Sequence, residues 1–520
     1  MTTFELSNRR FHGKLWPAVL LHVLLLFPVT TKAQLGSGAS IPTYHWLQED
    51  LKELQLRQPA LQIWTSSLPV RVDSVAHAVQ SLAASSSIFS ARLKHYFALK
   101  IDRQADAPQL LFGGLSSGGF GHIDEAMCSR FSQRFTTALR FSKNVYIHNV
   151  VNIDETLRDD PTYAGKKWRG FAAITEQAYG VWYGQRAQLK IGRDFVRWGR
   201  GEDATLLISD NSLPMDQLHL QLRTRYAQFS YFSAQLDRFA AQENLNNSGQ
   251  INRHLSAGRV DFAFFGRTLQ VGLSQAALYG RSGGFDWNYL NPFLVFHGEV
   301  LNSGGTANSF ASIDFSYFPS PGTEFYGELL IDDFQIEKSS VIDLEPDEYG
   351  LLFGARFADP FGSRGLTTGI EYTKVKNRTY NSPEFYEKFL HRNRPIGHFL
   401  GNDFDRWLLF MRKSIDNNWR IQAKADFRRH GRGRIEAAWD TPWLASTLAE
   451  GYSEPFPTGV VEKMQRFTLE MRWHPQPAVF FELMTQYSTF DNHFNVIGAE
   501  NGETEVRLNI WLEWSKWIRI

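Results

Sequence analysis

Residues 419–428, WRIQAKADFR, alternate between apolar and polar side chains at every position. A similar alternation recurs at 467–473 and at 506–514, where charged residues again occupy the second face. Successive side chains of a β-strand point to opposite faces, so each segment predicts a strand with one apolar and one charged face. A strand of a transmembrane barrel needs this pattern over about ten residues, because lipid lies outside and water inside. The pattern favours an all-β transmembrane barrel.

A large soluble β-sandwich or propeller is the alternative, because its strands alternate as well. Strands of soluble proteins are usually shorter, at about five or six residues, and seldom carry a face as charged as that of 419–428. The charged faces and the aromatic strand ends therefore favour the barrel.

The connections between expected strands test this interpretation. They are short after even-numbered strands and long after odd-numbered ones, with 429–463 as an example of the long class. Outer-membrane barrels have short periplasmic turns and long external loops, whereas a sandwich has no reason to show this rhythm. We expect about 18 antiparallel strands in up-and-down order, at 110–119, 131–141, 145–153, 171–183, 186–193, 217–226, 228–236, 258–265, 268–278, 311–318, 323–332, 350–357, 365–374, 405–413, 418–427, 464–473, 478–487 and 504–514.

The N-terminus has the pattern of an export signal. Arg9 and Arg10 precede an apolar run over 15–28, and small residues then lead to Ala33. The run is shorter than the roughly 20 residues that a membrane-spanning helix needs. This order predicts a signal peptide over residues 1–33, cleaved after Ala33, and localisation in the outer membrane.

Residues 44–100 follow helical rather than strand periodicity. Leu47, Leu51 and Leu54 recur at helical spacing, and similar series follow near 72–82 and 89–97. We expect a small helical domain over 34–105, on the periplasmic side or as a plug in the lumen, before a barrel over 106–520. An 18-stranded barrel is wide enough for an aqueous lumen, which a plug would block.

Composition argues against several classes of function. The formal net charge is +1, so no global basic field indicates a nucleic-acid partner. A single cysteine, Cys128, cannot form an intramolecular disulfide. The stretch 114–118 matches the Gly-x-Ser-x-Gly pattern, but that motif needs a strand-to-helix turn that is not expected here. We expect no catalytic residues, no metal site and no cofactor.

Several short motifs resemble the capsule-assembly Wzi family. They occur in the family's order and are Gly192-Arg193, Trp198–Gly201, Leu206–Asn211 with Pro214, Asn291-Pro292, Tyr326–Glu328 with Asp332-Asp333, and Gly397–Asp405. The resemblance covers almost the whole mature chain. It implies an outer-membrane β-barrel lectin that holds capsular polysaccharide at the cell surface, with helices closing the periplasmic end. Arg200 stands where the family motif usually has proline, which suggests a different ligand preference.

The loop over 194–216 is expected outside the cell and carries the chemistry that binds sugars. Aromatic faces stack on apolar faces of sugar rings, and planar charged groups make paired hydrogen bonds. A second long loop adds a tryptophan and an asparagine. The candidate glycan-binding residues are Arg193, Asp194, Trp198, Arg200, Glu202, Asp203, Asp210, Asn211, Trp287 and Asn291. Two alternatives remain: the charges are merely solvated, or Trp198 is a wedge that folds the loop into the lumen.

A third long loop contains Trp439 and Trp443, and a basic run over 428–434 lies at an external strand end. The run suits acidic polysaccharide and lipopolysaccharide phosphates equally well. The expected function is non-catalytic retention of capsular or other surface polysaccharide by a monomer that also contacts outer-membrane lipid and lipopolysaccharide. The alternatives are a porin or solute channel and, less favoured, an outer-membrane lipid or glycan enzyme.

Overall fold

The computed structural model describes residues 38–82, 88–98, 108–124, 126–158, 160, 163, 165–167, 171–240, 250–303, 307–335, 339–476 and 478–520. The signal peptide expected over residues 1–33 lies outside these ranges.

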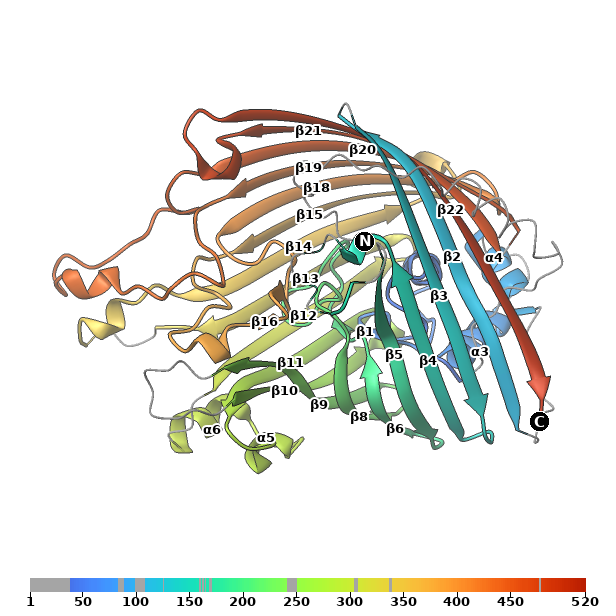
Figure 1. The fold of residues 1–520 in the computed structure, drawn as a ribbon, viewed down its shortest axis with the longest axis horizontal. Helices are drawn as coiled ribbons and strands as arrows, with labels where there is room; N and C mark the ends of the chain where they lie inside the picture. The colour runs from blue at the N-terminus through green and yellow to red at the C-terminus, as the bar shows by residue number, and fades with distance from the viewer. Residues whose placement is uncertain are drawn as a thin grey trace.

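Eighteen antiparallel strands form a closed barrel (Figure 1). They are β2 (Gln109–Ile123), β3 (Ala126–Arg140), β4 (Val145–Asp154), β5 (Ala172–Tyr183), β6 (Ala187–Asp194), β8 (Met215–Arg223), β9 (Ala227–Ala240), β10 (Gln250–Phe264), β11 (Leu269–Arg281), β12 (Asn308–Ser320), β13 (Thr323–Asp333), β14 (Glu348–Ala358), β15 (Leu366–Val375), β18 (Phe404–Ser414), β19 (Trp419–His430), β20 (Glu462–Gln476), β21 (Val479–Asp491) and β22 (Glu500–Arg519). Each strand pairs with its neighbours along the chain, and β2 closes the barrel against β22. The predicted fold class and strand number are confirmed.

The two faces of each strand have the environments that the alternation predicts. On β18, Trp407, Leu409 and Met411 point outward and are 42–50% exposed. Arg406 and Arg412 point into the lumen and are at most 4% exposed. Apolar side chains thus face outward and charged ones face inward, as in a barrel that crosses a bilayer.

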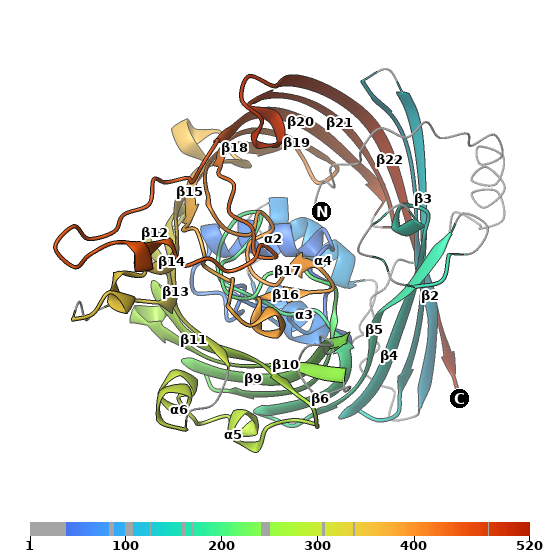
Figure 2. The ribbon, with the colours of Figure 1, turned by 60° about the vertical axis from the view of Figure 1, so that its left-hand side comes forward.

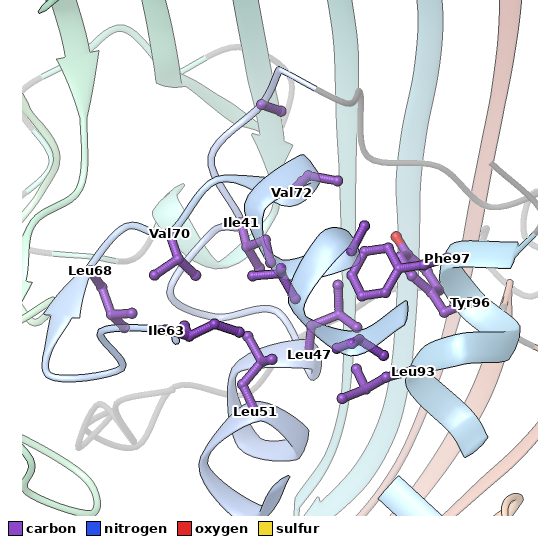
Figure 3. Packing of buried hydrophobic residues seen from close by; sticks show 14 of the residues in the cluster. Ile41, Leu47, Leu51, Ile63, Leu68, Val70, Val72, Leu93, Tyr96 and Phe97 are labelled. Carbon is purple, nitrogen blue, oxygen red and sulfur yellow. The ribbon is translucent and has the colours of Figure 1, made fainter. Parts of the chain in front are cut away.

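Three helices lie within the barrel (Figure 2). They are α2 (Leu47–Arg57), α3 (Val72–Gln80) and α4 (Ile88–Ala98). Their apolar faces form a core with inward-facing residues of the wall, and Figure 3 shows Leu47, Leu51 and Leu93 within it. No helix in the described ranges has the length and apolar character needed to cross a membrane.

The helical segment packs at the end of the barrel where the turns are short. Gly322, in the turn after β12, donates its N–H to the Leu56 carbonyl at 2.8 Å. Arg57 forms an ion pair of 3.0 Å with Asp359, in the turn after β14. Arg92 donates to the Asn417 carbonyl at 2.8 Å, in the turn after β18. These contacts hold the segment to several turns around the rim.

The remaining elements lie in loops at the opposite end or inside the lumen. They are the short strands β1 (Ser67–Leu68), β7 (Arg197–Trp198), β16 (Leu390–His391) and β17 (Arg394–Pro395), the helices α5 (Trp287–Leu290) and α6 (Phe296–Ser303), and the 3-10 helices η1 (Thr156–Arg158), η3 (Ile342–Leu344), η5 (Phe385–Glu387), η6 (Pro442–Ala445) and η7 (His493–Asn495). Two further 3-10 helices, η2 (Phe265–Arg267) and η4 (Pro360–Gly362), form short turns.

Candidate functional site

The loop of residues 195–214, between β6 and β8, turns into the lumen. Its strand β7 pairs with β1 of the N-terminal segment, so that Trp198 lies opposite Ser67. The N–H of Gly199 donates to the Ser66 carbonyl at 2.8 Å. Gly199 has φ +119°, and a Cβ at this position would lie 2.7 Å from Glu328 Oε2. The prediction that this loop is external is wrong, and the alternative of a Trp198 wedge in the lumen is the observed arrangement.

Apolar side chains in the loop give the physical reason. Trp198 is 1% exposed and packs edge-on against Phe232 of the wall, with ring centroids 5.4 Å apart. The run 206–208, Leu-Leu-Ile, is at most 1% exposed and joins the same apolar cluster. Removing such surface from water stabilises the structure by roughly 25 cal/mol per Å², so this loop is more stable inside the barrel than outside it.

Arg200 links the loop to both the wall and the helical segment. It is 2% exposed, forms an ion pair with Glu324 of β13, and donates to Gln55 Oε1 of α2 at 2.8 Å. Arg356 of β14 forms a 2.9 Å ion pair with the same Glu324 and donates to the Arg200 carbonyl at 2.8 Å. Arg200 is therefore part of a buried ion network.

Glu202 and Asp203 extend this network. Glu202 lies 2.5 Å from Arg412, and Asp203 lies 2.6 Å from Arg406 and 2.7 Å from Lys424. Burial alone would raise the pKa of Glu202, but the nearby arginines hold this pKa well below its usual value. Burial also opposes ionisation of Asp203, yet Lys424 and Arg406 lower its pKa strongly. Both carboxylates are ionised anchors of the loop.

Helix α2 supplies a second set of charges to this network. Glu49 lies 2.8 Å from both Arg420 and Arg472, and Glu53 lies 2.7 Å from both Arg57 and Arg412. Lys52 donates to the Gly201 carbonyl at 3.2 Å, and its pKa falls to about 7 because of burial and the nearby Arg197. Ion pairs thus join the helices, the loop and the wall across the lumen.

The other predicted residues of this loop region are dispersed. Asp194 is 1% exposed and accepts from Gln177 Nε2 at 2.7 Å. Arg193 points away from the lumen and pairs with Asp216 at 2.5 Å. Asp210 and Asn211 are half-buried, the former 3.7 Å from Arg197.

Trp287 and Asn291 lie elsewhere, on the segment of α5 and α6 that rests against the outside of the wall (Figure 2). Trp287 is 84% exposed, and Asn291 is exposed as well. The structure therefore does not gather the ten predicted residues in one site.

An aromatic and charged cluster occurs on the external loops. The Arg378 guanidinium lies 5.2 Å from the Trp439 ring centroid and 4.7 Å from that of Trp443. It also forms ion pairs of 2.7 Å with Asp440 and 2.9 Å with Glu454. Trp443 is 3% exposed, whereas Trp439 is half-buried and the Asp440 side chain is 75% exposed. We call Arg378, Trp439, Asp440, Trp443, Tyr452 and Glu454 the external cluster.

Sequence reasoning noted the two tryptophans of the external cluster but missed Arg378, which is distant in sequence. It also missed the lumen partners Glu324, Arg356, Arg406 and Arg412. Alternation assigns these four to the charged face, but nothing in the sequence pairs them with the loop. Two arginines of the basic run over 428–434 already have partners within the protein. Arg429 pairs with Asp405, and Arg434 donates to Asn495 Oδ1 at 2.9 Å.

Across the described ranges, no three histidine, cysteine or carboxylate side chains lie close enough to hold a metal ion. The arrangement instead provides hydrogen-bonding and stacking groups on the external loops above a lumen crossed by ion pairs.

Two solved structures are similar to this chain. The solved structure of Wzi from Escherichia coli, described as an outer-membrane protein involved in group 1 capsule assembly and a carbohydrate-binding β-barrel, is 16% identical with a TM-score of 0.60 and covers 91% of this chain and 99% of that chain. OprD from Pseudomonas aeruginosa is 11% identical with a TM-score of 0.42, covering 79% of this chain and 97% of that chain. No curated protein matches the sequence.

The family model described as capsule assembly protein Wzi matches residues 88–505. This match spans most of the barrel, and the closed barrel with its apolar outer face places the protein in the outer membrane. The chain therefore belongs to the capsule assembly protein Wzi family.

Proposed function

We propose that the protein binds capsular or other surface polysaccharide at the cell surface and retains it there without catalysis. The observation that carries the proposal is the external cluster, where Trp439 and Trp443 flank the Arg378 guanidinium. Family membership and the carbohydrate binding described for the Escherichia coli neighbour support it.

The external cluster has the chemistry that sugars require. The exposed part of Trp439 can stack on the apolar face of a sugar ring, since aromatic rings combine large apolar area with defined geometry. The exposed carboxylate of Asp440 accepts hydrogen bonds from hydroxyls, and charge-assisted hydrogen bonds are stronger than neutral ones. Arg378, whose side chain is 5% exposed, pairs with Asp440 at 2.7 Å.

Weak individual contacts are sufficient for retention. A polysaccharide repeats the same epitope along its length, and many barrels stand in one membrane. Linked binding events raise overall avidity by about 10²–10⁴ without any new contact. A shallow site with few hydrogen bonds is therefore adequate for this task.

We assign the four predicted residues that anchor the lumen loop a structural role in this function. Trp198, Arg200, Glu202 and Asp203 hold the lumen loop to the wall and to α2. With the helical segment on the periplasmic side, they would close the lumen and oppose a porin function. A glycan contact at Arg193, Asp194, Asp210, Asn211, Trp287 or Asn291 stays a prediction.

The absence of catalysis is likewise part of the proposal. Asp440 and Glu454, the carboxylates of the external cluster, both bind the same guanidinium. In this proposal they anchor a binding surface and do not act as an acid and base on either side of a scissile bond.

The test is Trp439→Ala in intact cells, with Phe361→Ala as the control, since Phe361 is an exposed aromatic residue in a short turn at the opposite end of the barrel. Trp439→Ala should release polysaccharide into the medium while the barrel still assembles, because binding energy concentrates in a few aromatic and arginine residues. Phe361→Ala should leave polysaccharide attached. Unchanged attachment in Trp439→Ala together with altered conductance in planar bilayers would favour the porin, and a chemically altered cell-bound glycan would favour the enzyme.

A further inference from the structure

Four neighbouring strands carry charged residues close to their external ends. Strands β15, β18, β19 and β20 lie side by side in the wall (Figure 1). In them Lys374, Asp405, Arg429 and Lys463 form one row, because each residue is the register partner of the next. Each is also the second residue from the external end of its strand. We call these four residues the rim row.

The side chains of the rim row point outward, toward the membrane. Trp407 lies two residues from Asp405 and Phe467 lies four residues from Lys463, and both rings are 48% exposed on the outer face. Side chains two residues apart share a face of the strand. The Tyr372 and Trp407 rings, 4.7 Å apart, form an aromatic row directly beneath the rim row. Aromatic girdles mark the interface of a membrane barrel, so the rim row lies at the level of lipid headgroups.

The positive charges of the rim row are only partly compensated. Arg429 donates through Nε and Nη2 to Asp405, which leaves Nη1 for another acceptor. Neither Lys374 nor Lys463 forms an ion pair with another residue of the described ranges. The Lys374 ammonium lies 4.4 Å from the centroid of the Phe456 ring, a contact that keeps its charge. The rim row therefore has three cations and one carboxylate.

Two of these cations lie directly opposite each other. Arg429 and Lys463 are cross-strand partners on the outward face, and like charges in this arrangement are destabilising. The Arg429 side chain is 51% exposed, and Lys463 is exposed as well. An anion between them would remove the repulsion, and hydrogen bonds from cationic groups to phosphate are stronger than neutral ones. Lys374 lies two strands away from Arg429, at about 10 Å, which suits a second phosphate.

The outward charges at the external end differ on either side of the rim row. Asp333 ends β13, and Asp491 of β21 lies in register with Glu500 of β22. On β6 and β8, the outward Arg193 is already paired with Asp216. A lipid phosphate therefore has a reason to bind at the rim row that an acyl chain, which contacts the apolar wall everywhere, does not have.

We propose that the rim row binds the phosphates of lipopolysaccharide in the outer leaflet. Arg429 and Lys463 hold one phosphate and Lys374 holds another, since the lipid A part carries one phosphate on each of its two sugars. The acyl chains then lie along the outer wall below Tyr372 and Trp407. The site gives the barrel a preference for a phosphorylated lipid in addition to its general contact with the bilayer.

The test uses the purified full-length protein and native mass spectrometry after detergent exchange. The probes are lipid A with both phosphates and the same lipid A after enzymatic removal of its phosphates, so that the acyl chains are identical. Wild type should retain the phosphorylated form in preference. Lys463→Gln and Lys374→Gln should each lower its retention by about fivefold, the factor that one basic side chain contributes near an anionic membrane surface. Lys463→Arg should retain it as wild type does.

Arg225→Gln is the matched control, because Arg225 is an exposed arginine in the short turn between β8 and β9 at the opposite end of the barrel. It should leave retention unchanged. Equal retention of the two lipid A forms by wild type would reduce the site to general wall contact and overturn the proposal. Equal retention by wild type and the double variant Lys374→Gln/Lys463→Gln would overturn the assignment to these residues. If the double variant keeps lipid A but no longer binds a soluble acidic polysaccharide, the rim row binds glycan and the proposal is wrong.

Discussion

Two long loops leave the same end of the barrel with similar composition, yet they have opposite environments. The loop at 195–214 follows β6 and lies in the lumen, where Trp198 is 1% exposed. The loop at 431–461 follows β19 and remains largely outside, where Trp439 is half-buried and Leu444 is 50% exposed. Tryptophan, arginine and carboxylates in an external loop therefore do not by themselves indicate a binding surface.

The side chains that each loop contacts explain why one loop lies in the lumen and the other outside. The lumen loop has the apolar run 206–208, and its charges meet opposite charges on the inner wall, such as Arg412 for Glu202. Burying a charge is costly unless it is paired and hydrogen-bonded. The external loop has its main ion pair with Arg378, in a neighbouring loop. Asp440 and Glu454 of this loop are thus paired without entering the barrel.

Surface proteolysis gives the sharpest test of this comparison. A protease added to intact cells should cut within 431–461, which is exposed over 447–450, and spare 195–214. Permeabilising the outer membrane should not make 195–214 more susceptible as long as the barrel is folded. Cleavage of 195–214 in intact cells would show that this loop leaves the lumen.

The largest effect on stability is expected from Trp198→Ala. Truncating a buried tryptophan typically costs about 3–5 kcal/mol, whereas Trp439→Ala should cost less because Trp439 keeps one side in solvent. The measurement is the urea midpoint of the folded barrel in detergent. Equal shifts of the midpoint for the two variants would contradict the different burial of Trp198 and Trp439.

Arg200→Ala should lower the free energy of unfolding by an amount comparable to that of Trp198→Ala. It leaves one oxygen of Glu324 without its partner at a site where both ionic side chains are 1% exposed, and breaking a buried pair costs about 3–5 kcal/mol. Arg193→Ala removes a pair whose Asp216 side chain is 56% exposed, so its cost should be about 0–1 kcal/mol. A small effect of Arg200→Ala would mean that Arg356 alone satisfies Glu324.

The smallest effect concerns pH and the loop beside the external cluster. Burial, followed by repulsion from Asp333, raises the pKa of Glu345 to about 7. The folded protein then binds this proton more tightly than the unfolded chain, so its stabilising contribution is complete below about pH 4.5 and is lost as pH rises to about 7. Glu345→Gln should remove this component, which is below about 1 kcal/mol for a half-exposed group. Urea midpoints of both proteins across this pH window provide the measurement, and parallel curves would contradict the assignment.

Period-two alternation was sufficient to predict the barrel. All 18 expected strands overlap observed ones, because a strand such as β19 must present Ile421 to lipid and Lys424 to the lumen wherever it lies in the wall. Boundaries differ by several residues: β10 begins at Gln250 rather than 258, and β22 continues to Arg519. In both strands the additional residues pair with a neighbouring strand, and such pairing is not visible in local alternation.

The candidate site was less predictable. Trp198 and Trp439 both lie in long loops, and so do Arg200 and Arg378. Only Trp198 and Arg200 have a partner on the inner wall or on α2. The segment with Trp287 was expected to be an external loop, and nothing local indicates that Gln275 holds it against the lipid-facing wall.

The sequence by itself determined the class of fold, the number of strands and the direction in which most wall side chains point, because these depend on neighbours one or two residues apart. Only the tertiary structure decided which loop fills the lumen and which charges pair across it. Those features depend on side chains that lie more than a hundred residues apart, as Arg200 and Glu324 do, and meet only after the barrel has closed.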